Sequence, residues 1–381
     1  MKLKQLNVDR YRCLREIRLP IKDFNVLIGS NASGKSTILD ALRFLKEGIH
    51  EGDFTSPMRR RGNMVHLAWK GEQADQITLE TEFSGKDTSE LSWLVKFEKT
   101  GYDFVVVEER VHRRSSPGRP PEELMRVSRG QGSWWSEDKQ QGVPVKVAAT
   151  ACTLAAAAAD DSFPAREIAD EVKKWNFFDP VPELIRRGSP VFEDTSGLDR
   201  FGRSLPIILY ELQENEAPVF ERVVSATRAI LGVPQNLEVQ KDQEEERFYF
   251  VQHEDGLQYP VHQLGASAGT LRVLALMTAL YGGKDTASLV AIEEPENYVH
   301  PVALQSLAEN IKNASPATQI ILTTHSPLLV NYFSPEDICI VKRSENGTQI
   351  YPEQQPDAIR KALQEAGFGL GAFHETKGFG A

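Results

Sequence analysis

The sequence predicts an α/β protein with a mainly parallel sheet flanked by helices, together with an antiparallel β lobe and a helical insertion. Three observations carry the prediction. The last third of the chain alternates apolar strands with helical segments, an order typical of a parallel sheet covered by helices. Residues 51–135 contain short alternating segments, as strands with one exposed face do. Residues 160–235 follow the helical period.

The N-terminal segment is expected to form strand, turn, strand and helix. Strands are predicted over residues 3–8, 17–21 and 24–28. A helix is predicted from residue 35 to about residue 46, because the apolar residues there fall on one helical face.

The remaining elements are predicted from the periodicity of apolar residues and from residues that favour turns. An Asp-Gly pair favours a hairpin turn at 255–256. The elements are strands at 77–83 and 102–107, a loop at 113–122, a small alanine-rich helix within 147–159, helices between 163 and 231 broken near Pro180 and over 188–202, a hairpin of 247–252 with 257–261, helices at 271–280 and 302–313, and strands at 289–292, 319–324 and 337–341.

These elements suggest a split domain. Residues 1–50 and 240–381 are expected to form a head, and residues 51–239 an inserted lobe, β-rich over about 51–135 and helical over about 160–235. The lobe contains many prolines and lacks sustained heptads, so a long coiled coil is excluded.

Composition limits the class of protein. The formal net charge of −10 gives no support to a general grip on DNA or anionic membrane, although a local basic groove is compatible with it. The N-terminus lacks the apolar core of a signal peptide, and no apolar stretch is long enough to cross a bilayer. Cys13, Cys152 and Cys339 stand far apart without metal or disulfide spacing, which fits a reducing cytoplasm.

A glycine-rich loop follows the predicted strand 24–28. Gly29-Ser-Asn-Ala-Ser-Gly34-Lys35-Ser36 fits the pattern G-x-x-x-x-G-K-[ST] at every fixed position, between a strand and a helix as the pattern requires. Loop amides and the positive helix end attract phosphate. We expect Lys35 to reach the outer phosphates of ATP, Ser36 to bind Mg²⁺ and Thr37 to touch the α-phosphate. A chance glycine loop is the alternative.

An acidic segment ends the apolar strand that begins at Leu289. Its sequence, Leu289-Val-Ala-Ile-Glu293-Glu294-Pro-Glu, places carboxylates at the C-terminal end of a buried strand, which is the ligand edge of a parallel sheet. Glu293 stands where an Asp more often holds Mg²⁺. Glu294 is the candidate base for the attacking water. The alternative is a solvated acidic turn.

Two further segments carry polar residues at functional places. His325 follows the apolar strand 319–324 and could hydrogen-bond the γ-phosphate, or be a structural histidine. Ser267 and Gly269 begin a helix, where a hydroxyl and free amides form an anion site. Because the glycine loop already supplies one phosphate site, this second site would serve ATP bound to a partner subunit. The alternative is a simple helix cap.

These four motifs, in this order, resemble the P-loop ABC-type ATPase heads of the SMC, RecF and OLD families, and more narrowly the compact RecF-like AAA family ATPases of bacteria. Arg12, in N-V-D-R-Y-R-C, resembles the arginine before their P-loop. Asn31 and Ser33 lie in a loop that matches their G-x-N-x-x-G-K-S form, although Ala32 replaces the usual Gly.

The later motifs extend the resemblance. The segment from Ser267 to Arg272 resembles their degenerate signature S-x-G-T-x-R, and E-E-P-E-N-Y-V-H-P resembles their Walker B and D-loop. His325-Ser-Pro matches the switch histidine, and 199–212 resembles a helix of their lobe. No Q-loop glutamine is assigned, Gln73 and Gln76 being the nearest candidates.

The resemblance implies a mechanism. Two heads would enclose two ATP molecules, each between one P-loop and the other subunit's Ser267 to Gly269, and hydrolysis would open the homodimer. Lys35, Mg²⁺ and His325 would act on the γ-phosphate and Glu294 on the water. About 40 residues follow Val341, which we consider too few for the Toprim nuclease domain of the OLD type.

Two functions remain open on the sequence. The first is an ATPase that acts on nucleic acid in repair or antiphage defence. Its candidate contacts, which could equally be solvated loops, are Arg59, Arg60, Arg61, Arg110, His112, Arg113, Arg114 and Arg119. The second is an ATP-gated switch or scaffold that controls a separately encoded effector, such as a nuclease or toxin.

Overall fold

The computed structural model describes most of the chain, and the described part divides into two compact units. The described residues are 1–71, 75–85, 89–116, 118, 120–190, 197–242, 244, 246–282, 287–314, 318–352 and 370. Of these, residues 1–22, 29–175 and 339–352 form the first unit, and 23–28, 176–338 and 370 the second. The division into a head and an inserted lobe by residue range remains a prediction.

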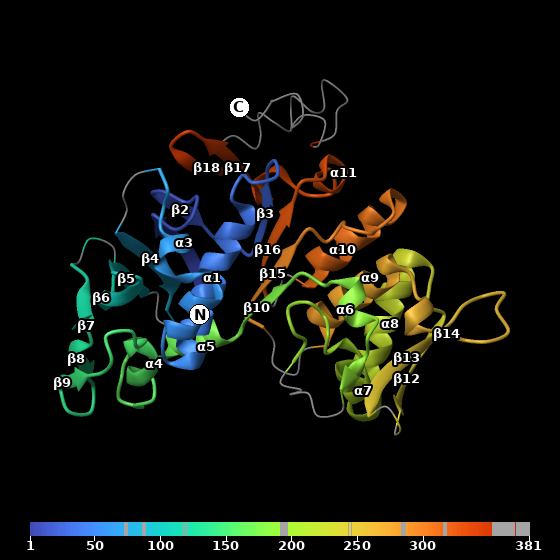
Figure 1. Ribbon diagram of the computed structural model, residues 1–381, viewed down its shortest axis with the longest axis horizontal. Helices are drawn as coiled ribbons and strands as arrows, with labels where there is room; N and C mark the ends of the chain where they lie inside the picture. Colours follow the sequence, from blue (N-terminus) through green and yellow to red (C-terminus); the bar gives the residue numbers. More distant parts are fainter. Residues whose placement is uncertain are drawn as a thin grey trace. The chain divides into compact units, whose positions relative to one another are not determined.

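The first unit is built on an antiparallel sheet of eight strands among the described residues, in the order β2-β1-β4-β5-β6-β7-β8-β9 (Figure 1). Burial alternates along β4 and β5, so one sheet face is apolar and the other polar. Its elements are β1 (Lys2–Asp9), β2 (Ile17–Pro20), α1 (Lys35–Glu51), α2 (Thr55–Arg60), α3 (Asn63–Leu67), β4 (Gln76–Ser84), β5 (Glu90–Thr100), β6 (Asp103–Arg114), β7 (Glu122–Ser128), β8 (Gln131–Ser136), β9 (Gln141–Lys146), α4 (Thr153–Ala157), α5 (Arg166–Lys173) and the hairpin of β17 (Ile338–Ser344) with β18 (Gly347–Pro352).

The second unit contains the parallel strands. β3 (Phe24–Ile28), β16 (Gln319–Thr324) and β15 (Leu289–Glu293) pair in parallel and lie side by side in Figure 1, with β10 (Trp175–Phe178) beside β15. The unit's other elements are α6 (Pro182–Ile185), β11 (Ser189–Pro190), α7 (Leu205–Asn215), α8 (Ala217–Leu231), β12 (Asn236–Asp242), β13 (Arg247–His253), β14 (Val261–His262), α9 (Ala268–Tyr281), α10 (Leu304–Ala314), α11 (Pro327–Val330) and 3₁₀ turns at Gln263–Gly265, Pro301–Ala303 and Pro335–Asp337.

The predicted fold class is confirmed, and several predicted elements need correction. The predicted hairpin forms only in part: β13 pairs with β14 at Val251 and Gln252, but it pairs along its whole length with the preceding β12, which was not predicted. The predicted helix 199–212 begins only at Leu205, because the Asp199 carboxylate accepts bonds from the amides of Phe201 and Ser204 and holds a turn there. The strand at 102–107 continues to Arg114, inside the predicted loop.

An aromatic cluster fixes α1 against the sheet of the first unit. The ring of Phe54 meets the ring of Phe97 edge to face, with centroids 4.9 Å apart, and Phe44 on α1 lies 5.4 Å from both. Gly48 faces this cluster from α1. Among the described residues, no helix is both long and apolar enough to span a membrane.

We predict that Gly48→Ala destabilises the protein, although alanine is the better helix former by about 1 kcal/mol. A Cβ atom at residue 48 would lie 2.0 Å from Cε1 of Phe54, so the buried ring must move. Overpacking of this kind costs about 1–3 kcal/mol. Urea unfolding measures the change, with His50→Ala on the exposed side of α1 as the control. A gain in stability for Gly48→Ala would contradict the tight contact.

Candidate functional site

The parallel strands of the second unit bring the acidic turn and the histidine to one edge of their sheet. Thr324 pairs with Ile28, and Thr323 pairs with Glu293, so β3, β16 and β15 end at nearly the same level. All of β3 and β16, and all but the last residue of β15, are buried, which matches their mainly apolar sequence. The chain leaves this edge into the glycine loop, the acidic turn and the histidine.

Glu294 is held at this edge by its backbone and its side chain. Its φ of 44° is left-handed, and its amide donates to the carbonyl of Thr323 at 2.9 Å. One carboxylate oxygen accepts from the Asn297 side-chain amide at 2.9 Å, and the other lies 3.1 Å from Nδ1 of His325. The candidate base and the switch histidine, 31 positions apart in sequence, are therefore in direct contact.

Glu296 forms hydrogen bonds with the last residue of β16 and with the backbone of the histidine that follows it. Its buried carboxylate accepts a hydrogen bond from the hydroxyl of Thr324 and a longer one, at 3.4 Å, from the amide of His325. Its second oxygen has no hydrogen-bond partner among the described residues. Burial raises the pKa of Glu296.

The glycine loop has the backbone of an anion-binding turn. Ala32 and Gly34 adopt left-handed φ angles of 62° and 114°. Ala32 carries a Cβ in this region, which costs roughly 1–2 kcal/mol relative to the right-handed region. A Cβ at Gly34 would lie 2.4 Å from the Thr348 hydroxyl oxygen, and one at Gly29 would lie 2.1 Å from the Val341 carbonyl oxygen. Both glycines are therefore required by close packing of the β17–β18 hairpin.

The polar groups of this loop fit a phosphate ligand. The Lys35 ammonium donates to the carbonyls of Gly29 at 2.7 Å and Ser30 at 3.0 Å, which holds a positive charge over the loop. The Ser33 hydroxyl is buried and has no hydrogen-bond partner among the described residues. Asn31 and Ser36 are exposed. A cation and an unsatisfied donor over a turn of amides form a site for an anion.

Two predicted nucleotide contacts are engaged with other residues of the first unit. The Thr37 hydroxyl accepts from the Cys13 thiol at 3.4 Å. The Arg12 guanidinium lies 3.1 Å from the Asp40 carboxylate. Burial alone would raise the pKa of Asp40, but Arg61, Arg43 and Arg12 outweigh it and hold that pKa below its usual range.

The predicted signature begins α9. The Ser267 hydroxyl caps the helix by accepting from the amide of Thr270 at 3.0 Å, so the helix-cap interpretation describes its contact within this chain. Ser267 remains exposed. A Cβ at Gly269 would lie 2.6 Å from the Tyr298 carbonyl oxygen, so glycine allows the signature to approach the turn after Glu294 closely.

Arg272, one turn further along α9, ties the signature helix to the acidic turn. Its buried guanidinium donates to the carbonyls of Glu293 and Glu294, each at 2.8 Å, and to the carbonyl of Pro180. It also lies 3.4 Å from Asp179. Burial, followed by the charge of Glu293, raises the pKa of Asp179.

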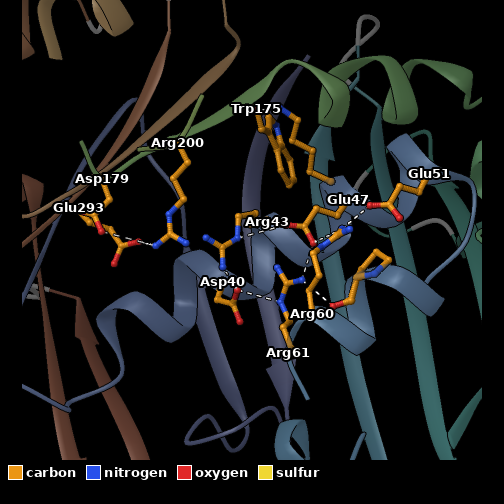
Figure 2. Close-up of polar contacts among 12 residues, drawn as sticks. Asp40, Arg43, Glu47, Glu51, Arg60, Arg61, Trp175, Asp179, Arg200 and Glu293 are labelled. Atoms are coloured by element: carbon orange, nitrogen blue, oxygen red, sulfur yellow. Dashed lines mark hydrogen bonds and ion pairs between the residues drawn. The ribbon is translucent and has the colours of Figure 1, made fainter. Parts of the chain in front are cut away.

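Glu293 is paired with an arginine from outside the predicted motifs. Nη2 of Arg200 lies 2.7 Å from a Glu293 carboxylate oxygen, as Figure 2 shows. Among the described residues, no group of three or more His, Cys, Asp or Glu side chains could hold a metal ion. The assignment of Glu293 and Ser36 to Mg²⁺ stays a prediction, in which one carboxylate and one hydroxyl would act together with phosphate oxygens and water.

The predicted basic run at 59–61 is largely neutralised. Arg61 is buried, with Nε 3.0 Å from Asp40 and Nη1 2.6 Å from Glu47 (Figure 2). Arg60 pairs with Glu47 at 3.0 Å and also with Glu51. Arg59 is exposed.

The second basic group lies along β6, opposite acidic strands. Arg119 and the Q-loop candidate Gln73 lie outside the described residues, and Gln76 donates to Glu98 at 2.9 Å. The pairs on β6 are Arg110 with Glu108, His112 with Glu123 at 3.7 Å, Arg113 with Glu122 at 3.0 Å and Arg114 with Glu90 at 3.3 Å.

Several residues at the site were not assigned roles from the sequence. Glu296 and Asn297 lie inside the acidic motif, and Arg272 ends the signature. The sequence therefore showed where these residues stand in the motifs, but their contacts depend on the fold. Arg200 lies in the segment 199–212, which was noted only for its resemblance to a helix of the lobe, and Asp179 was not noted; the fold brings both to Glu293.

Comparison with protein families matches residues 24–331 to the family described as "AAA domain, putative AbiEii toxin, Type IV TA system". No curated protein matches the sequence. Among solved structures, the chain is similar to an SMC head bound to the C-winged helix domain of ScpA, with TM-score 0.58, 13% identity and coverage of 94% of this chain and 100% of that one. It is also similar to the Smc head domain with an extended coiled coil, bound to the C-terminal domain of ScpA, from Pyrococcus furiosus, with TM-score 0.53, 12% identity and coverage of 96% and 100%. These identities are low, so the two structures establish the fold.

We predict that Glu296→Gln removes one pH-dependent part of the stability. A carboxyl whose pKa is raised by folding stabilises the protein most below its unfolded pKa, near 4.5, and loses that contribution as the pH rises through the folded pKa. The neutral amide does not titrate. The free energy of unfolding of the variant, minus that of the wild type, should therefore increase from about pH 4 to about pH 8. Urea unfolding at several pH values measures this difference, and a constant difference would contradict the raised pKa.

Proposed function

The chain belongs to the AAA domain family matched above, with the fold of SMC heads, and on that premise we propose that it is an ABC-type ATPase that binds ATP with Mg²⁺, dimerises around it and hydrolyses it. The observation that carries the proposal is the contact between Glu294 and His325 at the sheet edge where the chain enters the glycine loop. A base beside a hydrogen-bonding histidine suits attack by water on a phosphate.

The residues have separate roles in the proposed reaction. The loop amides, Lys35, Asn31 and Ser33 hold the phosphates, and Thr37 and Arg12 contact the same nucleotide. Ser36 and Glu293 hold Mg²⁺, which neutralises charge on the phosphate oxygens.

Hydrolysis is the step assigned to Glu294. Its carboxylate takes a proton from water while the water oxygen bonds to the γ-phosphorus. The bond from that phosphorus to the bridging oxygen breaks, and ADP and phosphate leave. His325 donates to the γ-phosphate and, through its contact with Glu294, links the presence of phosphate to the base.

The dimer completes the site in this proposal. Ser267 and Gly269 of one subunit face the nucleotide held by the loop of the other. The exposed position of Ser267 supports this assignment, as does its place at the N-terminus of α9, where a helix has a positive end.

The ATP-gated switch is favoured over direct action on nucleic acid. Binding to phosphate backbones depends on a positive surface, and five of the seven arginines predicted for this role pair with carboxylates on α1 or on β5, β6 and β7. The family description names a toxin of a toxin–antitoxin system, and the similar SMC heads are bound to a protein domain, which supports a protein partner or effector. Repair or antiphage defence on nucleic acid is the alternative.

We predict that Glu294→Gln binds ATP and loses at least about a hundredfold in turnover, within the range of a lost general base. It should accumulate as an ATP-dependent dimer, measured by light scattering beside steady-state hydrolysis.

Lys35→Ala should fail to bind ATP, and Ser267→Arg should bind ATP as a monomer. Normal turnover by Glu294→Gln would remove its role as base, and a dimer of Ser267→Arg would remove the signature assignment.

We also predict that duplex DNA leaves the hydrolysis rate unchanged, because five of the seven candidate arginines already pair with carboxylates. Steady-state turnover with and without DNA at low salt tests this, with Glu294→Gln as the blank. A rate raised several-fold by DNA and lost at higher salt would instead favour the nucleic-acid function.

A further inference from the structure

Glu293 is bound by a cation of the protein at the position where the proposed function needs it to bind a metal. The carboxylate ends β15 and is only partly exposed, at 16%. Nη2 of Arg200 lies 2.7 Å from its Oε1, a charge-assisted hydrogen bond of good length. Arg200 comes from the segment 197–204 that leads into α7, and this segment carries none of the four motifs.

The same guanidinium has a second carboxylate within reach. Nη2 of Arg200 lies 3.9 Å from Oδ2 of Asp179, so a small displacement would exchange Glu293 for Asp179. The backbones are already joined, since the amide of Asp179 donates to the carbonyl of Arg200 at 2.8 Å and Val181 donates to Phe201 at 3.0 Å. Figure 2 shows Arg200 directed at Glu293, with Asp179 beside it.

Asp179 is in turn anchored by the signature helix. Nη2 of Arg272 lies 3.4 Å from its Oδ1 and donates to the carbonyls of Glu293 and Glu294. Asp179 is therefore held at a fixed position relative to the acidic turn, 3.9 Å from the Arg200 guanidinium.

A guanidinium and a divalent cation compete for one carboxylate oxygen. Mg²⁺ requires close oxygen ligands in near-octahedral geometry and is repelled by a positive charge hydrogen-bonded to the same group. Arg200 occupies Oε1 of Glu293, so it must leave, or weaken its bond, before that oxygen can coordinate the metal.

We propose that Arg200 is a positioning residue that occupies Glu293 in the metal-free protein and transfers to Asp179 when the metal binds. The proposal rests on the assignment of Glu293 to Mg²⁺ in the proposed function. Arg200 would then couple metal loading to segment 197–204 and, through it, to α7. Both carboxylates keep a counter-charge in either state, which limits the cost of the exchange.

Binding of Mn²⁺, used as a spectroscopic substitute for Mg²⁺, tests the proposal without any turnover. The affinity is measured by electron paramagnetic resonance in the presence of a non-hydrolysable ATP analogue. Arg200→Gln should bind Mn²⁺ about tenfold more tightly, a change equivalent to about 1.4 kcal/mol of lost competition. Asp179→Asn should bind it more weakly, because Arg200 loses its second acceptor.

Controls separate competition from damage to the fold. Arg203→Gln, an exposed arginine of the same segment, should match the wild type. The analogue should bind wild type and Arg200→Gln equally in EDTA, and Arg200→Lys should resemble the wild type more closely than Arg200→Gln does.

The outcomes distinguish two failures. If the wild type shows no nucleotide-dependent Mn²⁺ binding, the proposed function itself is wrong. If the wild type binds Mn²⁺ and Arg200→Gln has the same or a lower affinity, only the competition is overturned. A lower affinity would mean that Arg200 holds Glu293 in place for the metal.

Discussion

Parallel pairing of β3, β16 and β15 is the constraint on which the candidate site depends. These strands are buried, so each backbone amide and carbonyl inside them must find a partner in the sheet. The register that satisfies them ends all three strands at one edge. Residues that directly follow neighbouring strands therefore lie close together. This is why Glu294 contacts His325 although the two are 31 positions apart in sequence.

A second layer of contacts turns separate motifs into one unit. The buried guanidinium of Arg272 holds the carbonyls of Glu293 and Glu294, and Gly269 packs against the carbonyl of Tyr298. A buried charge must keep its hydrogen-bond partners, because leaving one unpaired costs several kcal/mol. The first turns of α9 and the acidic turn therefore resist independent movement. Any group that displaces the start of α9 acts on the turn that presents Glu294.

The sequence predicted the part of this arrangement that local pattern encodes. Strand β3 and the start of α1 were expected at their observed residues, because a continuous apolar run followed by a glycine loop has few alternatives. The pairing of β13 with β12 was missed, because the sequence between them at 243–246, Gln-Glu-Glu-Glu, has no turn pair such as Asp-Gly. The same limit applies to Arg200, whose relation to Glu293 exists only in the folded chain.

The arginines show why charge alone gave an incomplete prediction. Arg61 sits in a run of three, which in sequence resembles a basic loop, and in the fold it is a buried partner of Asp40 and Glu47. Exposed ion pairs such as those on β6 are worth only about 0–1 kcal/mol each, so they would not by themselves prevent an arginine from turning to a phosphate. The carboxylate beside each arginine has the larger effect, because it cancels the local positive potential. Binding of a polyanion through release of counterions depends on that potential. The net charge of −10 adds no overall positive potential that would restore it. The paired arginines therefore connect elements of the protein to one another. The glycine loop, with the Lys35 ammonium and its backbone amides, is the place that suits an anion.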